Sequence, residues 1–476
     1  MEHAKEKQKL WYDKKPVERQ FKPGDLVLVV ASSKPTKLSV HWIGPGETED
    51  EEEIPVLECV DKSKGSKLCE LLEETRLKSK LSEAQQNQFE KLLNHYSELL
   101  SNGPGCTDMA KHDIELEEDK PIIAKPYRMS PRQTKILKAE VNKMLELNVI
   151  ERGDSDFTSP LILEVPGKDP RPCIDYRRLN KVTRTQYFPI PNIEELIEKV
   201  SSAKYISVLD LTRGYWQIPL SKQAQRYAAF VTSFGTFRPL RLPFGLKNAP
   251  YDFSRLMASL LRDCEEFAVP YLDDVAIFSN TWEDHVKHLE EIFVKMKTAK
   301  LHLKPSKCQF AREHVKYLGH IVGQGQRKPG ELKIQAVKEF PRPQNKTQIR
   351  SFLGLAGYYR RYIPDFLVIA AQLTDILKGK DVKSSVNWTS TCEDAFEELK
   401  KRLSERPVLY SPDFTAPFII QCDASNFGIG VVLSQINQDN EEHPIISFNL
   451  SSRYRLVSLA EAFDNPPFSF VIPIPA

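Results

Sequence analysis

The sequence has 476 residues, of which 41% are hydrophobic and 28% are charged, and 67 Lys and Arg against 65 Asp and Glu leave a net charge of +2. This composition excludes a wholly disordered chain, and the length is enough for two to four domains. Because the net charge is near zero, local basic patches would have to hold any nucleic-acid partner.

No apolar run approaches the roughly 18–20 residues that cross a bilayer, and the first residues carry no apolar signal segment. The eight cysteines are scattered, without the spacing of a zinc site. We therefore expect an intracellular protein with reduced thiols and no membrane partner.

The first predicted unit, residues 1–46, is a small β fragment. Pro23, Gly24 and Asp25 predict a turn before a short apolar strand. Six of the seven residues 47–53 are acidic, which indicates a solvated linker and a domain boundary. We assign residues 47–105 to this linker and to the amphipathic helix that follows it.

Two helices have recognisable start signals. Ser82 and Gln85 form a capping-box pattern ahead of apolar residues at helical spacing, which continue to Leu100. Ser130 and Gln133 mark the start of a second helix, with Pro131 at its first position.

Short apolar runs punctuated by Gly and Pro dominate from residue 158 onward. They predict strands with helices between them, which is an α+β fold. Residues 326–410 return to helical periodicity, and residues 418–432 again have the pattern of strands.

The carboxylates Asp273 and Asp274 lie between two apolar runs, where strand, tight turn and strand are expected. An ordinary Asp-rich hairpin turn is the simpler alternative. Asp210 directly follows another apolar strand. If the strands are neighbours, three negative charges meet at one sheet edge, which is tolerable only with bound cations.

Oxygen ligands of this kind favour Mg²⁺ or Mn²⁺. Two such ions about 3.5–4 Å apart can activate a primer 3′-hydroxyl while they stabilise the leaving pyrophosphate. The pattern therefore predicts nucleotidyl transfer.

Six sequence blocks within residues 106–410 resemble the reverse transcriptases of gypsy-like LTR retrotransposons, in the family order. The blocks are FTSPLILEVPGKDPRPCIDYRRLNKVT, LDLTRGYWQIPL, RLPFGLKNAPYDFSRLM, YLDDVAIFS, KCQF with KYLGHIV, and RSFLGLAGYYRRYIPDF. The resemblance implies a right-hand polymerase, with fingers and palm in residues 106–325 and a thumb or connection in residues 326–410. It also implies RNA- and DNA-directed DNA synthesis from dNTPs on an RNA or DNA template-primer, in the cytoplasm, a virus-like particle or the nucleus.

The resemblance carries metal-binding and catalytic roles onto Asp210 and Asp273. Asp274 would be a supporting third carboxylate, and the carbonyl of Leu211 would be a further ligand. The implied cofactor is a pair of Mg²⁺ or Mn²⁺ ions.

Four positions match the family's dNTP site. Arg171 and Lys168 would hold the triphosphate, because a leaving pyrophosphate needs fixed cationic donors; a solvated basic loop is the alternative. Tyr215 would be an aromatic gate against a ribose 2′-hydroxyl, or else an ordinary core tyrosine. Phe244 stands where some retroviral relatives carry Gln, so a polar contact to the nucleotide is absent there.

Two segments are expected to hold the primer and template. Tyr317 and Gly319 belong to a hairpin that resembles the family's primer grip. Residues 341–361 interleave aromatic residues with cations, which suits contact with a phosphate backbone, although a core helix with basic edges has the same pattern. The cations are Arg342, Lys346, Arg350, Arg360 and Arg361.

The two ends of the sequence resemble pieces of other retroelement domains. Residues 411–476 resemble a truncated RNase H-like α/β module in which Asp423 would be the first metal carboxylate, with Glu461 a weak stand-in for a second. One Asp cannot build a two-metal site, so we expect hybrid cleavage to be lost. Residues 1–46 resemble the carboxyl-terminal tail of an integrase without its zinc cluster or catalytic core.

An alternative from another functional class is a catalytically silent, nucleic-acid-binding remnant of a retroelement. The apparent truncations favour the remnant, whereas the three unaltered aspartates favour the polymerase. The sequence leaves the oligomeric state open.

Overall fold

The computed structural model of the chain describes residues 30–31, 41–42, 71, 81–164, 171–189, 191–378, 386–405, 407–425, 428–437 and 440–451. The chain divides into two units, residues 1–62 and 63–476. In the first unit, β1 (Val30–Ala31) and β2 (His41–Trp42) form an antiparallel pair. The rest of the predicted β fragment, with its integrase-like pattern, and the acidic stretch lie outside the described residues.

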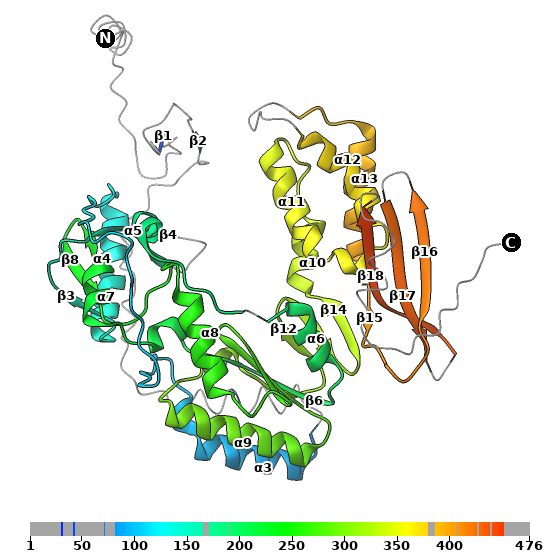
Figure 1. Cartoon of the computed structure of the whole chain (residues 1–476), viewed down its shortest axis with the longest axis horizontal. Coiled ribbons are helices and arrows are strands. Elements are labelled where there is room, and N and C mark those ends of the chain that lie inside the picture. The colour runs from blue at the N-terminus through cyan, green and yellow to red at the C-terminus, as the bar shows by residue number, and fades with distance from the viewer. Residues whose placement is uncertain are drawn as a thin grey trace, which may run out of the picture. The chain divides into compact units, whose positions relative to one another are not determined.

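In the second unit, a four-stranded antiparallel sheet contains the strands predicted around the aspartates (Figure 1). Its strand order is β11-β6-β10-β9, so β6 and β10 are neighbours, as the carboxylate hypothesis required. Their bounds are β6 (Tyr205–Asp210), β9 (Ala268–Tyr271), β10 (Asp274–Ser279) and β11 (Gln309–Arg312).

Side-chain alternation buries both faces of this sheet. Val208 and Ala276 belong to an apolar cluster with helix α6, whereas Leu209 and Val275 belong to a second cluster that includes α8 and α9. Helices α3 and α9 pack against each other, as Figure 1 also shows. The helix bounds are α3 (Glu83–His95), α6 (Ile193–Ser201), α8 (Ala249–Leu260) and α9 (Trp282–Thr298).

A buried imidazole ties α9 to the two central strands. The nitrogens of His285 lie 2.8 Å from the Ser207 hydroxyl of β6 and 3.0 Å from the Ser279 hydroxyl of β10. Burial, together with the nearby His288, lowers the pKa of His285 to about 3, so the ring is neutral at physiological pH. The strands that carry the aspartates are thereby fixed to the helix beneath them.

The predicted capping boxes are confirmed. Ser82 caps α3 with Gln85, and Ser130 caps α4 (Pro131–Glu146) with Gln133. The first helix ends earlier than the apolar spacing suggested, because residues 99–101 bond the backbone of Leu303 instead of continuing the helix.

A second sheet, within the region predicted to hold the fingers, has the order β3-β8-β7-β4-β5, and of its strand pairs only β4 and β7 are parallel. Helix α4 shares an apolar cluster with it. The bounds are β3 (Ile150–Arg152), β4 (Ser159–Glu164), β5 (Arg171–Ile174), β7 (Phe230–Thr232), β8 (Gly235–Pro239), α5 (Arg177–Val182) and α7 (Lys222–Tyr227).

A third sheet, of order β12-β13-β14-β15, contains strands from both sides of the predicted 325/326 boundary. The helices between its last two strands in the sequence share one apolar core, as the helical periodicity of residues 326–410 indicated. The bounds are β12 (Val315–Tyr317), β13 (His320–Gly323), β14 (Gln326–Pro329), β15 (Leu409–Tyr410), α10 (Glu331–Lys338), α11 (Lys346–Tyr358), η4 (Arg360–Tyr362), α12 (Phe366–Ile376) and α13 (Ser390–Ser404).

The last described strands form an antiparallel sheet of order β16-β17-β18. They are β16 (Ile419–Ser425), β17 (Gly428–Ile436) and β18 (Glu442–Ser451), which confirms the strand pattern predicted near residues 418–432. The α+β class is confirmed throughout these regions. Within the described residues, the structure contains no helix long and apolar enough to cross a membrane.

Candidate active site

Two of the predicted carboxylates face each other across a strand pair. Asp210 is the last residue of β6, and the antiparallel register places it opposite Asp274, the first residue of β10. Because side chains alternate along a strand, both carboxylates lie on the face of the sheet that also carries Val208 and Ala276. The Lys307 ammonium donates a 2.8 Å hydrogen bond to Asp210 Oδ2 and neutralises part of the charge.

Asp273 lies in the two-residue turn between β9 and β10. Leu272, the first residue of that turn, has a φ of 50°, a left-handed conformation that costs a non-glycine residue roughly 1 kcal/mol or more. The Asp273 carbonyl accepts a 3.1 Å hydrogen bond from the Leu211 N–H, which fixes the turn against the end of β6. This strained turn conformation places Asp273 beside the other two carboxylates.

The three carboxylates repel one another in a partly dry site. Burial, then the charges of Asp274 and Asp210, raises the pKa of Asp273 to about 6. Burial and Asp210 raise the pKa of Asp274 to about 6, and Lys307 opposes both shifts. Oδ1 of Asp273 is buried without a hydrogen-bond partner. Lys307 therefore compensates only part of the negative charge of this cluster, and Asp273 Oδ1 has no hydrogen-bond donor.

A hard divalent cation would supply what this site lacks. The donors are carboxylate oxygens, and an unpartnered buried oxygen points to a missing ligand. Among the residues that the structure describes, no three His, Cys, Asp or Glu side chains lie close enough together to hold a metal ion. Lys307 engages Asp210 instead. The residue types fit such a cation.

A glycine that the sequence analysis did not single out permits this packing. A Cβ on Gly214 would lie 3.0 Å from both Asp273 Oδ1 and Phe253 Cζ, so a larger residue would displace the carboxylate. Gly214 begins the 3₁₀ turn η2 (Gly214–Gln217), after Arg213 at a φ of 50°. The available signal was a glycine four residues after Asp210.

Lys307 was also missed, although it lies within the quoted KCQF block. It is the last residue of η3 (Pro305–Lys307), close in space to Asp210 but almost a hundred positions away in sequence. Nothing in its local sequence distinguishes it from a solvated lysine.

Two residues predicted to bind the nucleotide lie together. The rings of Tyr215 and Phe244 meet edge to face, with centroids 5.1 Å apart. Tyr215 also packs on Phe253 of the core, and burial with the charge of Asp273 raises its pKa to about 12. Phe244 is 49% exposed. Tyr215 thus combines core packing with a position beside the carboxylates.

The two predicted triphosphate ligands are not brought into this cluster by any described contact. Arg171 is the exposed first residue of β5 and pairs through its backbone with Glu164 in the fingers sheet. Lys168 lies outside the described residues.

The predicted primer-grip hairpin is formed by β12 and β13, but the side chain of one predicted contact residue, Tyr317, does not reach the surface. The side chain of Tyr317 is buried, at 1% exposure, and its hydroxyl has no partner. Gly319 has a φ of 78°, and its carbonyl accepts a 2.7 Å bond from the Tyr359 hydroxyl. Tyr317 therefore supports the hairpin from inside instead of touching nucleic acid with its ring.

The cations of residues 341–361 divide into three groups. Arg350 and Arg360 are exposed, as a phosphate-binding face requires. Arg361 pairs with Glu194 of α6 at 3.2 Å. Lys346 is buried and donates to the Lys378 carbonyl, so its place in the basic stripe was an incorrect interpretation. Arg342 pairs with Glu393.

The remaining predicted carboxylate, Asp423, lies on β16, where its backbone pairs with Gly430 of β17. Its side chain and the whole of Glu461 lie outside what the structure describes.

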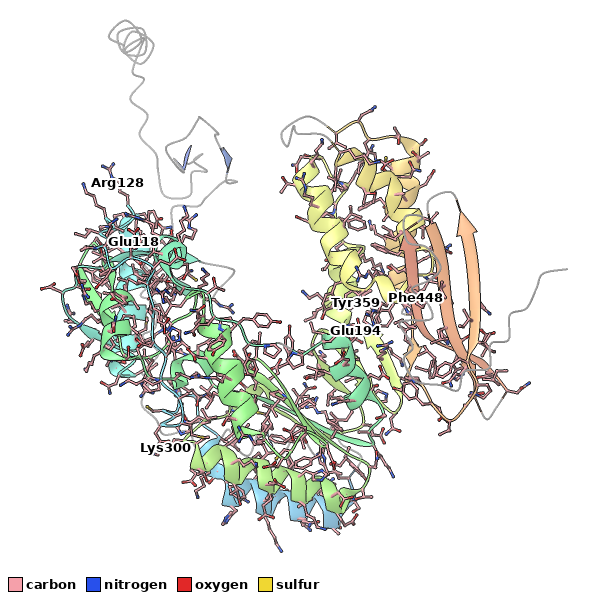
Figure 2. All side chains as sticks on the ribbon, in the orientation of Figure 1. Glu118, Arg128, Glu194, Lys300, Tyr359 and Phe448 are labelled. Carbon is pink, nitrogen blue, oxygen red and sulfur yellow. The ribbon has the colours of Figure 1, made fainter. Side chains whose placement is uncertain are left out.

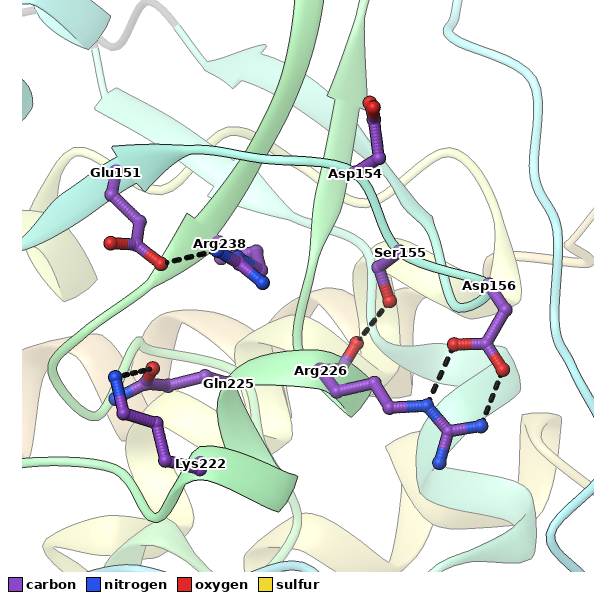
Figure 3. Close-up of a pocket in the computed structure, with 8 residues that line it drawn as sticks. All are labelled: Glu151, Asp154, Ser155, Asp156, Lys222, Gln225, Arg226 and Arg238. Carbon is purple, nitrogen blue, oxygen red and sulfur yellow. Dashed lines mark hydrogen bonds and ion pairs between the residues drawn. The ribbon is translucent and has the colours of Figure 1, made fainter.

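The fingers region contains a pocket of about 590 Å³ (Figure 3). Its charges largely pair internally: Arg226 with Asp156, and Arg238 with Glu151 at 2.8 Å. None of the predicted site residues lines it. The lining residues are Glu151, Asp154, Ser155, Asp156, Lys222, Gln225, Arg226 and Arg238.

Two protein families match this chain. Residues 164–322 match the family described as "Reverse transcriptase (RNA-dependent DNA polymerase)". Residues 388–454 match the "RNase H-like domain found in reverse transcriptase".

Curated relatives match along much of the chain. The sequence is 36% identical over 347 residues to the retrovirus-related Pol polyprotein from transposon 297 of Drosophila melanogaster, covering 71% of this chain and 32% of that polyprotein. It is 35% identical over 339 residues to the Pol polyprotein from transposon gypsy of the same organism, covering 68% and 33%. The chain thus spans about a third of the length of these relatives.

Solved structures share the fold. The foamy viral protease-reverse transcriptase in complex with double-stranded DNA matches with a TM-score of 0.75 at 22% identity, over 86% of this chain and 75% of that chain. The same viral protein with an RNA/DNA hybrid matches with a TM-score of 0.72, over 88% and 57%.

Replacing Lys307 with Met should strengthen binding of a divalent cation. The substitution removes a charge that competes for Asp210, so we expect Mn²⁺ affinity to rise by about fivefold, equivalent to roughly 1 kcal/mol. Titration with Mn²⁺, followed by its paramagnetic signal, measures the affinity of the unaltered and substituted chains. Lys300→Met removes the same charge from an exposed pair with Asp108 and should leave the affinity unchanged. Equal or weaker binding in Lys307→Met would show that the lysine does not compete.

Proposed function

Because the chain belongs to the reverse transcriptases of gypsy-like LTR-retrotransposon Pol polyproteins, we propose that it catalyses RNA- and DNA-directed DNA synthesis. Members of this family are nucleotidyltransferases that depend on divalent metal. The observation that carries the proposal is the register that sets Asp210 opposite Asp274, with Asp273 in the adjoining turn.

Asp210, Asp273 and Asp274 are proposed to hold two Mg²⁺ or Mn²⁺ ions, with the Leu211 carbonyl as an added ligand. When bound, such ions activate a primer 3′-hydroxyl and stabilise the departing pyrophosphate. The carboxylates must be deprotonated to bind metal. Because the pKa values of Asp273 and Asp274 are raised to about 6, protons compete with metal below that pH.

The substrate roles follow the positions of the surrounding side chains. Tyr215 lies beside Asp273, and Phe244 packs on Tyr215; both are proposed to contact the sugar of the incoming dNTP. Arg171 and Lys168 are proposed to hold its triphosphate. Exposed Arg350 and Arg360 are proposed to contact the template-primer, in keeping with the duplexes bound by the foamy viral enzyme.

Primer extension on an RNA template with dNTPs and Mg²⁺ tests the function. We expect extension by the unaltered chain, and a loss of roughly a thousandfold in Asp273→Asn, because a neutral amide cannot replace a metal-binding carboxylate. Gly214→Ala should reduce the rate by about tenfold or more, because its methyl group would displace Asp273.

Gly103→Ala is the matched control, since a Cβ there would have Ser101 Oγ as its nearest neighbour at 3.8 Å, an ordinary van der Waals contact. It should leave the rate unchanged. Activity that survives Asp273→Asn contradicts the assigned carboxylate. Salt-dependent binding of template-primer by a well-folded chain that does not extend it would favour the silent remnant instead.

Replacing Tyr215 with Val should relax selection against ribonucleotides. Loss of the ring removes a steric barrier to a 2′-hydroxyl, so the ratio of rNTP to dNTP incorporation should rise by about tenfold, or roughly 1.4 kcal/mol. Single-nucleotide insertion kinetics measure this ratio. Tyr187→Val, at an 85% exposed tyrosine, should leave it unaltered. An unchanged ratio in Tyr215→Val would contradict a role of Tyr215 in selecting against ribonucleotides and would indicate that it only packs in the core.

We also propose that the RNase H-like module of this chain does not cleave RNA–DNA hybrids. The sequence pattern offers Asp423 as a nuclease carboxylate, and a two-metal site needs several. Incubation of the purified chain with a labelled hybrid and Mg²⁺ should leave the RNA strand intact. RNA fragments that disappear in Asp423→Asn would contradict this proposal.

A further inference from the structure

A partly buried ionic cluster joins three elements of the chain. It consists of Glu194 on α6, Arg327 on β14 and Arg361 in η4, and is called here the Glu194 cluster; Figure 2 labels Glu194. One carboxylate oxygen, Glu194 Oε2, accepts from Arg327 Nη1 at 3.0 Å and lies 3.2 Å from Arg361 Nη1. Two arginines thus share one acid.

Arg327 makes a further contact with the RNase H-like sheet. Its Nη2 donates a 2.9 Å hydrogen bond to the carbonyl oxygen of Ile445 on β18. Arg327 is 6% exposed, so its charge is removed from water and depends on these partners. Its Nε is buried without a partner.

The carbonyl that receives Arg327 is made available by a β-bulge. In the pairing of β17 with β18, Leu433 faces Ile446 and Ser434 faces Pro444, so Ile445 has no ladder partner. A bulge leaves its extra residue unpaired and redirects its groups, and this bulge lies at the residue that Arg327 contacts. Ile445 itself is buried.

The contact continues along the edge of the RNase H-like sheet. β18 is an edge strand, and it packs against β15, η4 and α12. Figure 1 shows β18 beside this helical region. An uncovered edge strand would expose unpaired backbone groups, so these elements cover the edge of the sheet.

From η4 the contacts reach the β12–β13 hairpin. The Tyr362 hydroxyl bonds buried His320 at 2.8 Å. Just before η4, the Tyr358 and Tyr359 hydroxyls donate to the carbonyls of Leu318 and Gly319 at 2.6 and 2.7 Å. A continuous set of polar contacts therefore runs from β18, through the Glu194 cluster and η4, to the hairpin.

We propose that the RNase H-like sheet serves as a structural support for the polymerase, docked by Arg327 on the Ile445 carbonyl. Arg327 and Glu194 are positioning residues: they fix η4 and, through it, the hairpin at residues 317–319. The docking itself is independent of catalysis. Its consequence for DNA synthesis rests on the proposed function.

Hydrogen exchange in the full chain tests the docking directly. In Arg327→Met, we expect amide exchange in β18 and η4 to accelerate by about tenfold or more, while β6 and β10 keep their protection. The matched control Arg255→Met removes an exposed arginine that pairs with buried Asp252 on α8, and it should change neither segment. Unchanged exchange in β18, or equal acceleration in β6, would overturn the proposal.

A milder variant guards against loss of folding in Arg327→Met. Glu194→Gln keeps the side-chain shape and removes the shared charge, so exchange should accelerate in the same segments by a smaller factor. Combining both substitutions should give less than the product of their separate effects, because they break one network. Simple multiplication of the two effects would overturn the assignment of a shared cluster.

DNA synthesis supplies the second readout. With a trap for released enzyme, Arg327→Met should shorten the product made per binding event by about threefold, while the rate of a single insertion stays within about twofold. A selective fall in the insertion rate would contradict a positioning role. If the unaltered chain does not extend primers, that result contradicts the proposed function and not the docking. The hydrogen-exchange result then tests the docking alone.

Discussion

Like charges held at one edge of a buried sheet are the constraint on which the rest of this structure depends. The register of β6 and β10 forces Asp210 and Asp274 together, and the turn adds Asp273. Burial and repulsion raise the pKa of both Asp273 and Asp274 to about 6, so the protein holds these groups at a cost in stability. Such a cost is typical of a site built to bind a cation.

The surrounding chain reduces that cost without removing it. Lys307 neutralises Asp210, whereas Oδ1 of Asp273 remains unpartnered. Gly214 lets the carboxylate approach so closely that a Cβ there, 3.0 Å from Asp273 Oδ1, would require the carboxylate to shift, and Leu272 adopts a left-handed backbone conformation to form the turn. Strain and unsatisfied charge therefore concentrate at the same few residues, whereas the helices and sheets around them follow ordinary packing rules.

What the sequence could predict was local. The capping boxes at Ser82 and Ser130, and the short apolar runs that predicted strands, depend only on neighbouring residues, and the structure confirms them. The contacts of Lys307 and Arg361 depend on which acidic residue, distant in sequence, lies opposite each of them in the fold, and local sequence patterns do not contain this information. Burial of Tyr317 was missed for the same reason, since a hairpin motif does not say which of its faces is covered.

The Glu194 cluster extends the same reasoning to the RNase H-like sheet. A buried arginine is stable only while its partners stay in place, so removing the sheet would leave Arg327 short of an acceptor and β18's neighbours uncovered. These packing requirements do not depend on whether the sheet carries nuclease carboxylates. A chain that lacks hybrid cleavage would therefore still need this sheet for its packing, because β15, η4 and α12 pack against β18 and Arg327 donates to Ile445.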